Sequence, residues 1–307
     1  MSDKPLVSIL MTAYNREKYI KEAIESVLAS SYTDFELIIC DDRSTDNTVS
    51  IAREYVALDR RVKLFINEAN LGDYFNRNKA ASHALGKYIK YLDSDDTIYP
   101  YSLQIMVEEM EKFPDVSFAF NANEIQDPEM AYPVLYTSRQ AYMTHYFSIG
   151  GLFYAGPGGT IIRKSSFDKI GPFSGKRFIS DGEMWMKFAL HGPILKIQPG
   201  LIWWRVHAGQ EFTAGTSEYA LLRYNLDKEM LNHPVCPLTE KEKKMALGNN
   251  RRILSRKILG LLFWHLNFLA AFQLAKNAGI GPLQLLESML PVNKMKKAHR
   301  TFIQKIK

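Results

Sequence analysis

Three carboxylates stand within four residues, at Asp93, Asp95 and Asp96, directly after the apolar run 88–92. Ionised carboxylates this close repel one another, and a buried strand beside them makes their charge costlier still. Capping the next helix needs only one aspartate, so the cluster exceeds what capping explains. Hard divalent cations such as Mg²⁺ and Mn²⁺ bind carboxylate oxygens, and they commonly coordinate substrate phosphate oxygens at the same time. The cluster therefore predicts a metal site that holds a diphosphate.

A second acidic pair, Asp41 and Asp42, follows the apolar run 35–40. Two interpretations compete for it. The segment 41–48 is a good turn with a helix cap, because Asp and Ser side chains satisfy unpaired backbone donors, and taken alone this interpretation is favoured. The other interpretation is a ligand-binding role, which requires the pair to meet the first cluster in space.

Short apolar strands that alternate with amphipathic helices are the elements that must position these carboxylates. The first four strands are expected at 6–11, 35–40, 61–66 and 87–92. Asn15 is the expected N-cap of the first helix. The alternation predicts an α/β fold with a mainly parallel central sheet flanked by helices. Ligands of such sheets bind outside the carboxyl ends of the strands, where both acidic groups are then expected to meet.

The composition is that of a soluble globular chain with ample material for a core. The 307 residues are 46% hydrophobic and 23% charged, enough for one large domain with an appendage or for two domains. Two cysteines cannot form a disulfide framework and fit a reducing compartment. The N-terminus lacks a signal-peptide pattern, and no run reaches the roughly 18 apolar residues of a membrane span. A cytoplasmic location is expected.

Five motifs in register resemble the inverting glycosyltransferases of family 2, which have the GT-A fold. They lie at 7–48, 70–72, 77–78, 86–96 and 180–185, and the resemblance extends over roughly residues 5–207. It implies a GT-A nucleotide-diphospho-sugar transferase domain at 1–217. The nucleotide-binding half is expected at 1–115 and the acceptor half at 116–217, followed by a helical C-terminal extension at 218–307.

The resemblance implies a nucleotide site at the first two strand ends. Thr12, Ala13 and Tyr14 are expected against the base, although a packed aromatic is an equally good reading of Tyr14. Asp42, with Asp41 beside it, is expected to read the base edge. A buried carboxylate discriminates well there, because a base without an N–H donor would leave it unpaired.

The metal motif and an arginine complete the donor side of the implied site. Asp95 is the first metal ligand, and Asp93 and Asp96 assist it, with Ser94 in the donor-binding set. Arg77 resembles a family arginine that faces the nucleotide, and a guanidinium suits a phosphate or a base carbonyl. A solvated helix charge is the competing interpretation of Arg77.

The acceptor side of the resemblance supplies a base and a second basic motif. Asp181 is the expected base that removes the proton of the acceptor hydroxyl, with Glu183 as second candidate. Ser180 stands where the family usually has Glu, and Asp181 is also a good helix cap. Arg205 and His207 resemble the family's Arg-x-His, with His207 reaching the diphosphate or the metal; a merely packed histidine is the alternative.

The function implied is metal-dependent, inverting transfer from a nucleoside-diphosphate sugar, with Mn²⁺ or Mg²⁺ as cofactor. The donor is expected to be a UDP-sugar, and the acceptor a hydroxyl of a glycan or lipid-linked sugar in cell-surface polysaccharide synthesis. A catalytically inactive sugar-nucleotide-binding or scaffold protein is the alternative. A nucleotidyltransferase or a NAD-dependent dehydrogenase is not expected, because the turn 12–19 has no glycine.

The C-terminal part is basic and apolar, and the net charge of the whole chain is +6. The apolar run 258–272 is preceded directly by Arg251, Arg252, Arg256 and Lys257. A packed helical subdomain or homo-oligomer interface is one interpretation, and peripheral contact with anionic lipid at the cytoplasmic membrane face is the other. Nucleic acid is not an expected partner, because the tail lacks a basic groove with stacking aromatics.

Overall fold

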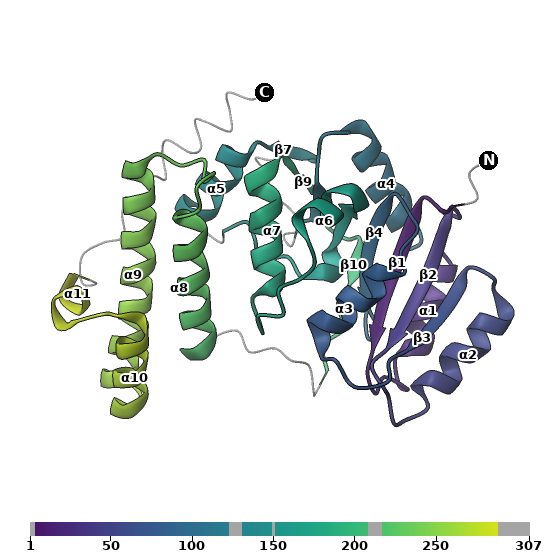
Figure 1. Ribbon diagram of the computed structural model, residues 1–307, viewed down its shortest axis with the longest axis horizontal. Helices are drawn as coiled ribbons and strands as arrows, with labels where there is room; N and C mark the ends of the chain where they lie inside the picture. Colours follow the sequence, from purple (N-terminus) through teal and green to yellow (C-terminus); the bar gives the residue numbers. More distant parts are fainter. Residues whose placement is uncertain (1–3, 123–130, 149–150, 208–216, 288–307) are drawn as a thin grey trace. The chain divides into compact units, whose positions relative to one another are not determined.

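The computed structural model describes residues 4–122, 131–148, 151–207 and 217–287 (Figure 1). The chain groups into two compact units. One combines residues 1–137 with 154–210, and the other combines 138–153 with 211–307. The helical C-terminal part that the sequence predicts therefore belongs to a unit that also recruits an earlier segment of the chain.

A mixed eight-stranded sheet forms the centre of the first unit, with the strand order β3-β2-β1-β4-β8-β6-β9-β7. The parallel strands of one half are β1 (Val7–Ala13), β2 (Phe35–Asp41), β3 (Val62–Ile66) and β4 (Tyr88–Asp93). The remaining strands are β8 (Thr160–Arg163), β6 (Phe118–Asn121), β9 (Ile194–Ile197) and β7 (Val134–Tyr136). The four strands expected from the sequence are confirmed, and they are the parallel half.

Six helices and one 3₁₀ turn accompany this sheet within the described residues. They are α1 (Ile20–Leu28), α2 (Thr48–Leu58), α3 (Asp73–Ser82), α4 (Ser102–Lys112), η1 (Pro157–Gly159), α6 (Lys164–Ile170) and α7 (Ser180–His191). A separate two-stranded sheet pairs β5 (Thr97–Ile98) with β10 (Ile202–Trp203) in antiparallel register.

Helices cover both faces of the parallel strands, as the sequence predicts. The face of β1 formed by Val7, Ile9 and Met11 packs against α1 in one buried cluster. Helix α3 contacts β1 and β2, and Figure 1 shows it in front of the strands while α1 lies behind them. Burial on both faces explains why these strands are continuous apolar runs instead of alternating ones.

The expected N-cap at Asn15 is wrong. Helix α1 begins at Ile20, and Asn15 has a left-handed backbone with φ of 52°. Its side-chain oxygen instead accepts a hydrogen bond from the Thr45 backbone amide at 2.8 Å. Asparagine tolerates this conformation better than most residues, so it serves here as a turn residue that ties two loops together.

The second unit is helical in the residues that the structure describes. Its helices are α5 (Ser138–Phe147), α8 (Ser217–Leu231), α9 (Glu240–Phe263), α10 (Phe268–Ala278) and α11 (Pro282–Glu287). Helix α9 begins with a capping box between Thr239 and Glu242. The second unit has its own small core, which includes Leu254, Ile258 and Leu274. No helix among the described residues has the length and apolar character needed to cross a bilayer.

Candidate active site

The carboxyl ends of three neighbouring strands bring the first group of predicted residues together. Strand β1 lies between β2 and β4, and the register places Thr12 beside both Cys40 and Asp93, with Ala13 beside Asp41. The strand order turns back on itself at β1 and β4, and such a switch point is where open sheets bind ligands. The two acidic groups therefore meet at one edge of the sheet, as the sequence predicts.

Asp41 and Asp42 hold the loops at this edge. Asp41 is fully buried and accepts hydrogen bonds from the Ser44 amide at 2.9 Å and the Ser44 hydroxyl at 2.5 Å, which confirms the turn interpretation. Asp42 accepts from Asn67 Nδ2 and from the backbone amides of Leu71 and Gly72, at 2.8 to 2.9 Å. Its carboxylate thus fixes the entry to α3 while remaining at the strand end.

Arg77 is buried on α3, which excludes the interpretation as a solvated surface charge. Its guanidinium pairs with Asp73 at 2.9 Å and with Asp93 at 2.6 Å. Burial alone would lower the pKa of Arg77, but the two carboxylates outweigh burial and raise it above its ordinary value. Its Nη1 is buried and makes no hydrogen bond within the described part of the chain. The N–H donors of this nitrogen are therefore not used by the described residues.

Asp95 lies at the meeting point of two distant segments. One of its oxygens, Oδ2, is 3.0 Å from Arg16 Nε and 3.1 Å from His207 Nε2. The pairing of β10 with β5 carries His207 there, because β5 directly follows the acidic motif. The structure therefore places His207 against the acidic motif, where its expected role toward the diphosphate or the metal stays a prediction.

Asp96 is the most buried of the three aspartates. Burial and the neighbouring Asp93 charge raise the pKa of Asp96 to about 7. The backbone amide of Arg205 donates to it at 3.0 Å. The Arg205 guanidinium lies over the rings of Tyr19 and Trp203, at 5.1 and 4.5 Å from their centroids. The Arg-x-His motif thus contacts two of the three acidic residues.

The possible metal ligands around Asp95 fit a divalent cation only in part. Asp95 and His207 offer two adjacent ligand atoms, while no set of three His, Cys, Asp or Glu side chains in the described ranges is arranged to hold a metal. Mg²⁺ is usually held by one or two protein groups and completes its shell with phosphate oxygens and water. Burial, and then the negative charge of Asp93, raise the pKa of Asp96, and a cation bound nearby would oppose both effects. The residues therefore suit a cation shared with a diphosphate.

Asp181 lies in the first turn of α7, beside the start of α3. Tyr74 of α3 lies within electrostatic range of it: burial raises the pKa of the Tyr74 phenol above its ordinary value, and the charges of Asp181 and Asp73 raise it further. Asp73 in turn binds Arg77. The Asp181 carboxylate also accepts a hydrogen bond from the backbone amide of Gly182 at 2.7 Å, so it pairs one of the first amides of α7. The structure thus brings Asp181 to the neighbourhood of the donor-side residues.

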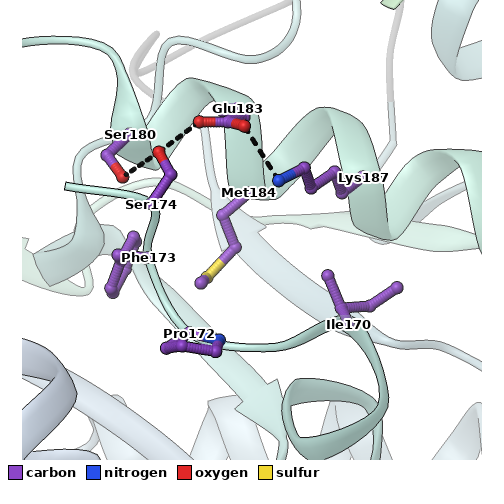
Figure 2. A pocket seen from close by; sticks show the side chains of 8 residues that line it. All are labelled: Ile170, Pro172, Phe173, Ser174, Ser180, Glu183, Met184 and Lys187. Carbon is purple, nitrogen blue, oxygen red and sulfur yellow. Dashed lines mark hydrogen bonds and ion pairs between the residues drawn. The ribbon is translucent and has the colours of Figure 1, made fainter. Parts of the chain in front are cut away.

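Glu183 has a different environment from Asp181 (Figure 2). Glu183 is buried and accepts a hydrogen bond from the Ser174 hydroxyl. It also forms ion pairs with Lys187 at 2.8 Å and Lys176 at 3.2 Å. Burial alone would raise the pKa of Glu183, but the bonds from Lys187 and Ser174 leave it below its ordinary value. A carboxylate held by two lysines is a weak base, so this geometry favours a structural role.

Ser180, the departure from the family pattern, belongs to the same hydrogen-bonded group. Its hydroxyl is 3.1 Å from the Ser174 hydroxyl and accepts from the Gly175 amide at 3.2 Å. Figure 2 shows Ser174 between Ser180 and Glu183, at a small hollow whose lining does not include Asp181. Ser180 therefore holds the loop before α7.

Two residues of the site, Arg16 and Lys90, were not predicted from the sequence. Arg16 follows the β1 turn, and its position at a strand end was the available signal. Lys90 lies inside the apolar strand β4 and is fully buried, with Nζ donating to the carbonyl oxygens of Tyr91 and Gly158. A lysine within a buried strand is rare enough to have been a signal too. Burial lowers the pKa of Lys90 to about 7.

The fold and the acidic strand ends define a GT-A-type glycosyltransferase, and comparisons with known proteins agree. The model of glycosyl transferase family 2 matches residues 8–171, more than half of the chain, and the chain belongs to this family. The putative glycosyltransferase EpsE of Bacillus subtilis is 43% identical over 113 residues, covering 36% of this chain and 41% of EpsE.

A second relative carries a more specific name. WfgD of Escherichia coli, a UDP-Glc:alpha-D-GlcNAc-diphosphoundecaprenol beta-1,3-glucosyltransferase, is 41% identical over 123 residues, which are 40% of this chain and 47% of WfgD. The matched part spans less than half the length of these curated relatives.

Solved structures extend the likeness in fold to nearly the whole chain. Staphylococcus aureus TarS 1–349 in complex with UDP-GlcNAc has a TM-score of 0.66 at 19% identity, covering 97% of this chain and 87% of TarS 1–349. The mannosyltransferase PcManGT of Pyrobaculum calidifontis, in complex with GDP-Man and Mn²⁺, has a TM-score of 0.58 at 16% identity, covering 99% of this chain and 84% of PcManGT. At these identities the likeness establishes the GT-A fold.

Proposed function

We propose that this chain is a metal-dependent inverting glycosyltransferase of polysaccharide synthesis. It would move a sugar from a nucleoside-diphosphate donor, a UDP-sugar, to a hydroxyl of a glycan or lipid-linked acceptor. The observation that carries the proposal is the contact of Asp95 with His207 at the switch point of a GT-A sheet. The relative WfgD, which is named for a UDP-Glc donor and a diphosphoundecaprenol-linked acceptor, supports this choice of substrates.

The donor side of the proposed mechanism binds and orients the nucleotide sugar. The base lies against Thr12, Ala13 and Tyr14, and Asp42 reads its edge. A Mn²⁺ or Mg²⁺ ion held by Asp95 and by His207, when bound, supplies positive charge for the departing diphosphate.

Fixed positive charges of the chain add to the same effect. The Arg77 guanidinium and the Arg205 guanidinium flank the acidic motif, and preorganised cations stabilise charge that develops during the reaction. Asp93 and Asp96 are held in place, Asp93 by its ion pair with Arg77 and Asp96 by a hydrogen bond from the Arg205 amide, and Ser94 between them belongs to the donor-binding set.

The acceptor side of the proposed mechanism activates the attacking hydroxyl. Asp181 accepts the hydroxyl proton while the oxygen forms a bond to the anomeric carbon, on the face opposite the diphosphate. The bond between that carbon and the diphosphate oxygen breaks, and its electron pair leaves with the diphosphate. Asp181 is favoured over Glu183, because ion pairs with Lys176 and Lys187 reduce the basicity of Glu183. A lipid-linked acceptor would place the enzyme at the cytoplasmic face of a membrane.

Replacing Asp181 by Asn tests the proposal. The variant is expected to bind UDP-sugar as the wild type does and to lose transfer by about a hundredfold or more, because the amide cannot accept the proton. Glu183→Gln serves as the matched control and is expected to retain the larger share of turnover. Transfer would be followed by release of UDP from a panel of UDP-sugars with Mn²⁺ and a glycan acceptor.

Two outcomes of this experiment would count against the proposal. Near-normal turnover of Asp181→Asn would remove Asp181 as the base. Donor binding by the wild type with no transfer to any acceptor would favour the alternative, a catalytically inactive sugar-nucleotide-binding protein. This second candidate is supported by Ser180, which stands where the family usually has glutamate.

A further inference from the structure

Six large apolar side chains are exposed where α9 passes into α10. They are Phe263, Trp264, Leu266, Phe268, Leu269 and Phe272, with exposed fractions between 64% and 81%. They lie within ten consecutive residues, at the end of α9, in the following turn and on the first half of α10, and are called here the α9–α10 patch. Scattered exposed apolar residues are ordinary, whereas a contiguous group of this size marks an interaction surface.

The patch is not the face by which α10 packs into its own unit. Ala271 and Leu274 on this helix are buried in the core that also contains Leu254 and Ile258 of α9. Phe268 and Phe272, four residues apart, lie on the other side of the helix, where Lys276 continues their row. Figure 1 shows α10 beside the end of α9, in agreement with their contacts. Helix α10 therefore has two apolar faces, and only the face with Ala271 and Leu274 is buried in the core of the second unit.

The turn that carries the patch is held in place by hydrogen bonds. The backbone amides of Trp264 and His265 donate to the Gly260 carbonyl, at 3.0 and 3.2 Å. The amide of Asn267 donates to the Leu261 carbonyl at 2.9 Å, and its side chain caps α10 by accepting from the Ala270 amide. The exposed aromatic side chains are thus presented by a fixed turn, which lowers the entropic cost of binding through them.

The charge around the patch identifies the kind of partner. From residue 243 to 307 the sequence has thirteen Lys or Arg and a single Glu. Arg256 on α9, about two helical turns before Phe263, and Lys276 on α10, about one turn after Phe272, are exposed. Residues 288–307 contain six of the basic residues and no acidic one, so like charge disfavours this segment as the cover of the patch. A second copy of the same face is disfavoured for the same reason.

We propose that the α9–α10 patch is a docking surface for an anionic lipid bilayer. Phe, Trp and Leu side chains enter the boundary between headgroups and acyl chains, and the surrounding Lys and Arg side chains contact anionic headgroups. The helices lie on the surface and do not cross it. This inference deepens the proposed location at a membrane face and rests on it, and it adds the residues that make the contact.

Sedimentation of the full chain with vesicles tests this inference without donor or acceptor, so that its failure would leave the transfer proposal standing. The vesicles are phosphatidylcholine alone or phosphatidylcholine mixed with phosphatidylglycerol. Binding is expected only to the mixed vesicles, and it is expected to fall as salt is raised, because salt screens the headgroup attraction. Lys276→Gln is expected to weaken it about fivefold, the contribution of one basic residue near an anionic surface.

Apolar substitutions separate insertion from charge attraction. Phe268→Ser combined with Phe272→Ser is expected to weaken vesicle binding by at least about tenfold, because apolar area no longer enters the bilayer. Leu58→Ser on α2 is the matched control, since Leu58 is 78% exposed and lies outside the patch. The fluorescence of Trp264 is expected to shift to shorter wavelength on mixed vesicles, and Trp264→Phe is expected to remove that shift.

Three results would overturn the inference. The first is no binding to the mixed vesicles at low salt. The second is equal binding by the wild type and the Phe268→Ser, Phe272→Ser variant. The third is a concentration-dependent dimer in analytical ultracentrifugation that this double substitution dissolves, because the patch would then be an interface between copies of the chain.

Discussion

At the scale of single residues, the site combines carboxylates and cations that restrain one another. Asp93 is paired with Arg77, and Asp95 with Arg16 and His207, before any ligand is considered. In the proposed mechanism, a cation bound here would have to share or replace these contacts, and the diphosphate that arrives with it would supply further ligands. Such mutual dependence suits a site that should bind metal and donor together.

Lys90 lies beneath this motif and makes a testable contribution to stability. Its pKa falls from 10.5 to about 7, chiefly through burial, with Asp93 and Asp96 opposing the shift. Between these pH values the unfolded chain binds a proton at Lys90 that the native chain does not. The free energy of unfolding should therefore rise with pH from about 7 to about 10, by up to roughly 1.4 kcal/mol per pH unit.

Comparison with Lys90→Met isolates this contribution. Urea unfolding of both proteins at pH 7 and pH 9 is expected to show a rise with pH in the wild type that is smaller in the variant. Equal pH dependence of the two proteins would mean that Lys90 titrates normally in the native state. The difference between the proteins removes the contributions of the other titrating groups, because these are common to both.

At the scale of elements, the short pairing of β5 with β10 connects the two halves of the site. It places Arg205 and His207 of a late segment beside the acidic motif of an early one. The Arg205 guanidinium is then held between the ring of Trp203 and the ring of Tyr19. A pairing of two residues per strand thus places these basic side chains at the acidic motif.

Trp203→Ala is expected to loosen Arg205 and weaken UDP binding about fivefold, since one cation–π contact contributes about 1 kcal/mol. Trp203→Phe should restore the larger part of the affinity, because a ring remains under the guanidinium. The neighbouring Trp204→Ala is the control and is expected to leave UDP affinity unchanged. Calorimetric titration with UDP and Mn²⁺ gives the comparison. Equal affinity of Trp203→Ala and wild type would show that this stacking does not act on the donor.

The elements of the first unit were the easiest part to predict from the sequence. Strands β1 to β4 are apolar runs bounded by turn residues, so local pattern alone located them. The cap at Asn15 was wrong, because its partner is Thr45, thirty residues later in the chain. Arg16 and Lys90 were missed for the same reason. Their roles depend on Asp95 and Gly158, which only the fold brings near.

At the scale of the whole molecule, the chain consists of a GT-A unit and a helical unit, each with its own core. The sequence predicted a helical C-terminal part but did not assign residues 138–153 to it. Buried polar contacts explain this assignment, because His145 on α5 and Arg223 on α8 lie 2.7 Å apart. Such long-range partners leave no signal in local hydrophobic pattern.

The most direct test of the central claim is calorimetric titration of the full chain with UDP, with and without Mn²⁺, for the wild type and Asp95→Asn. The account predicts that Mn²⁺ strengthens UDP binding to the wild type by at least about tenfold and has little effect on the variant. Asp115→Asn, an exposed acid outside the site, is expected to behave as the wild type does. Equal dependence on Mn²⁺ in the wild type and Asp95→Asn would contradict the account.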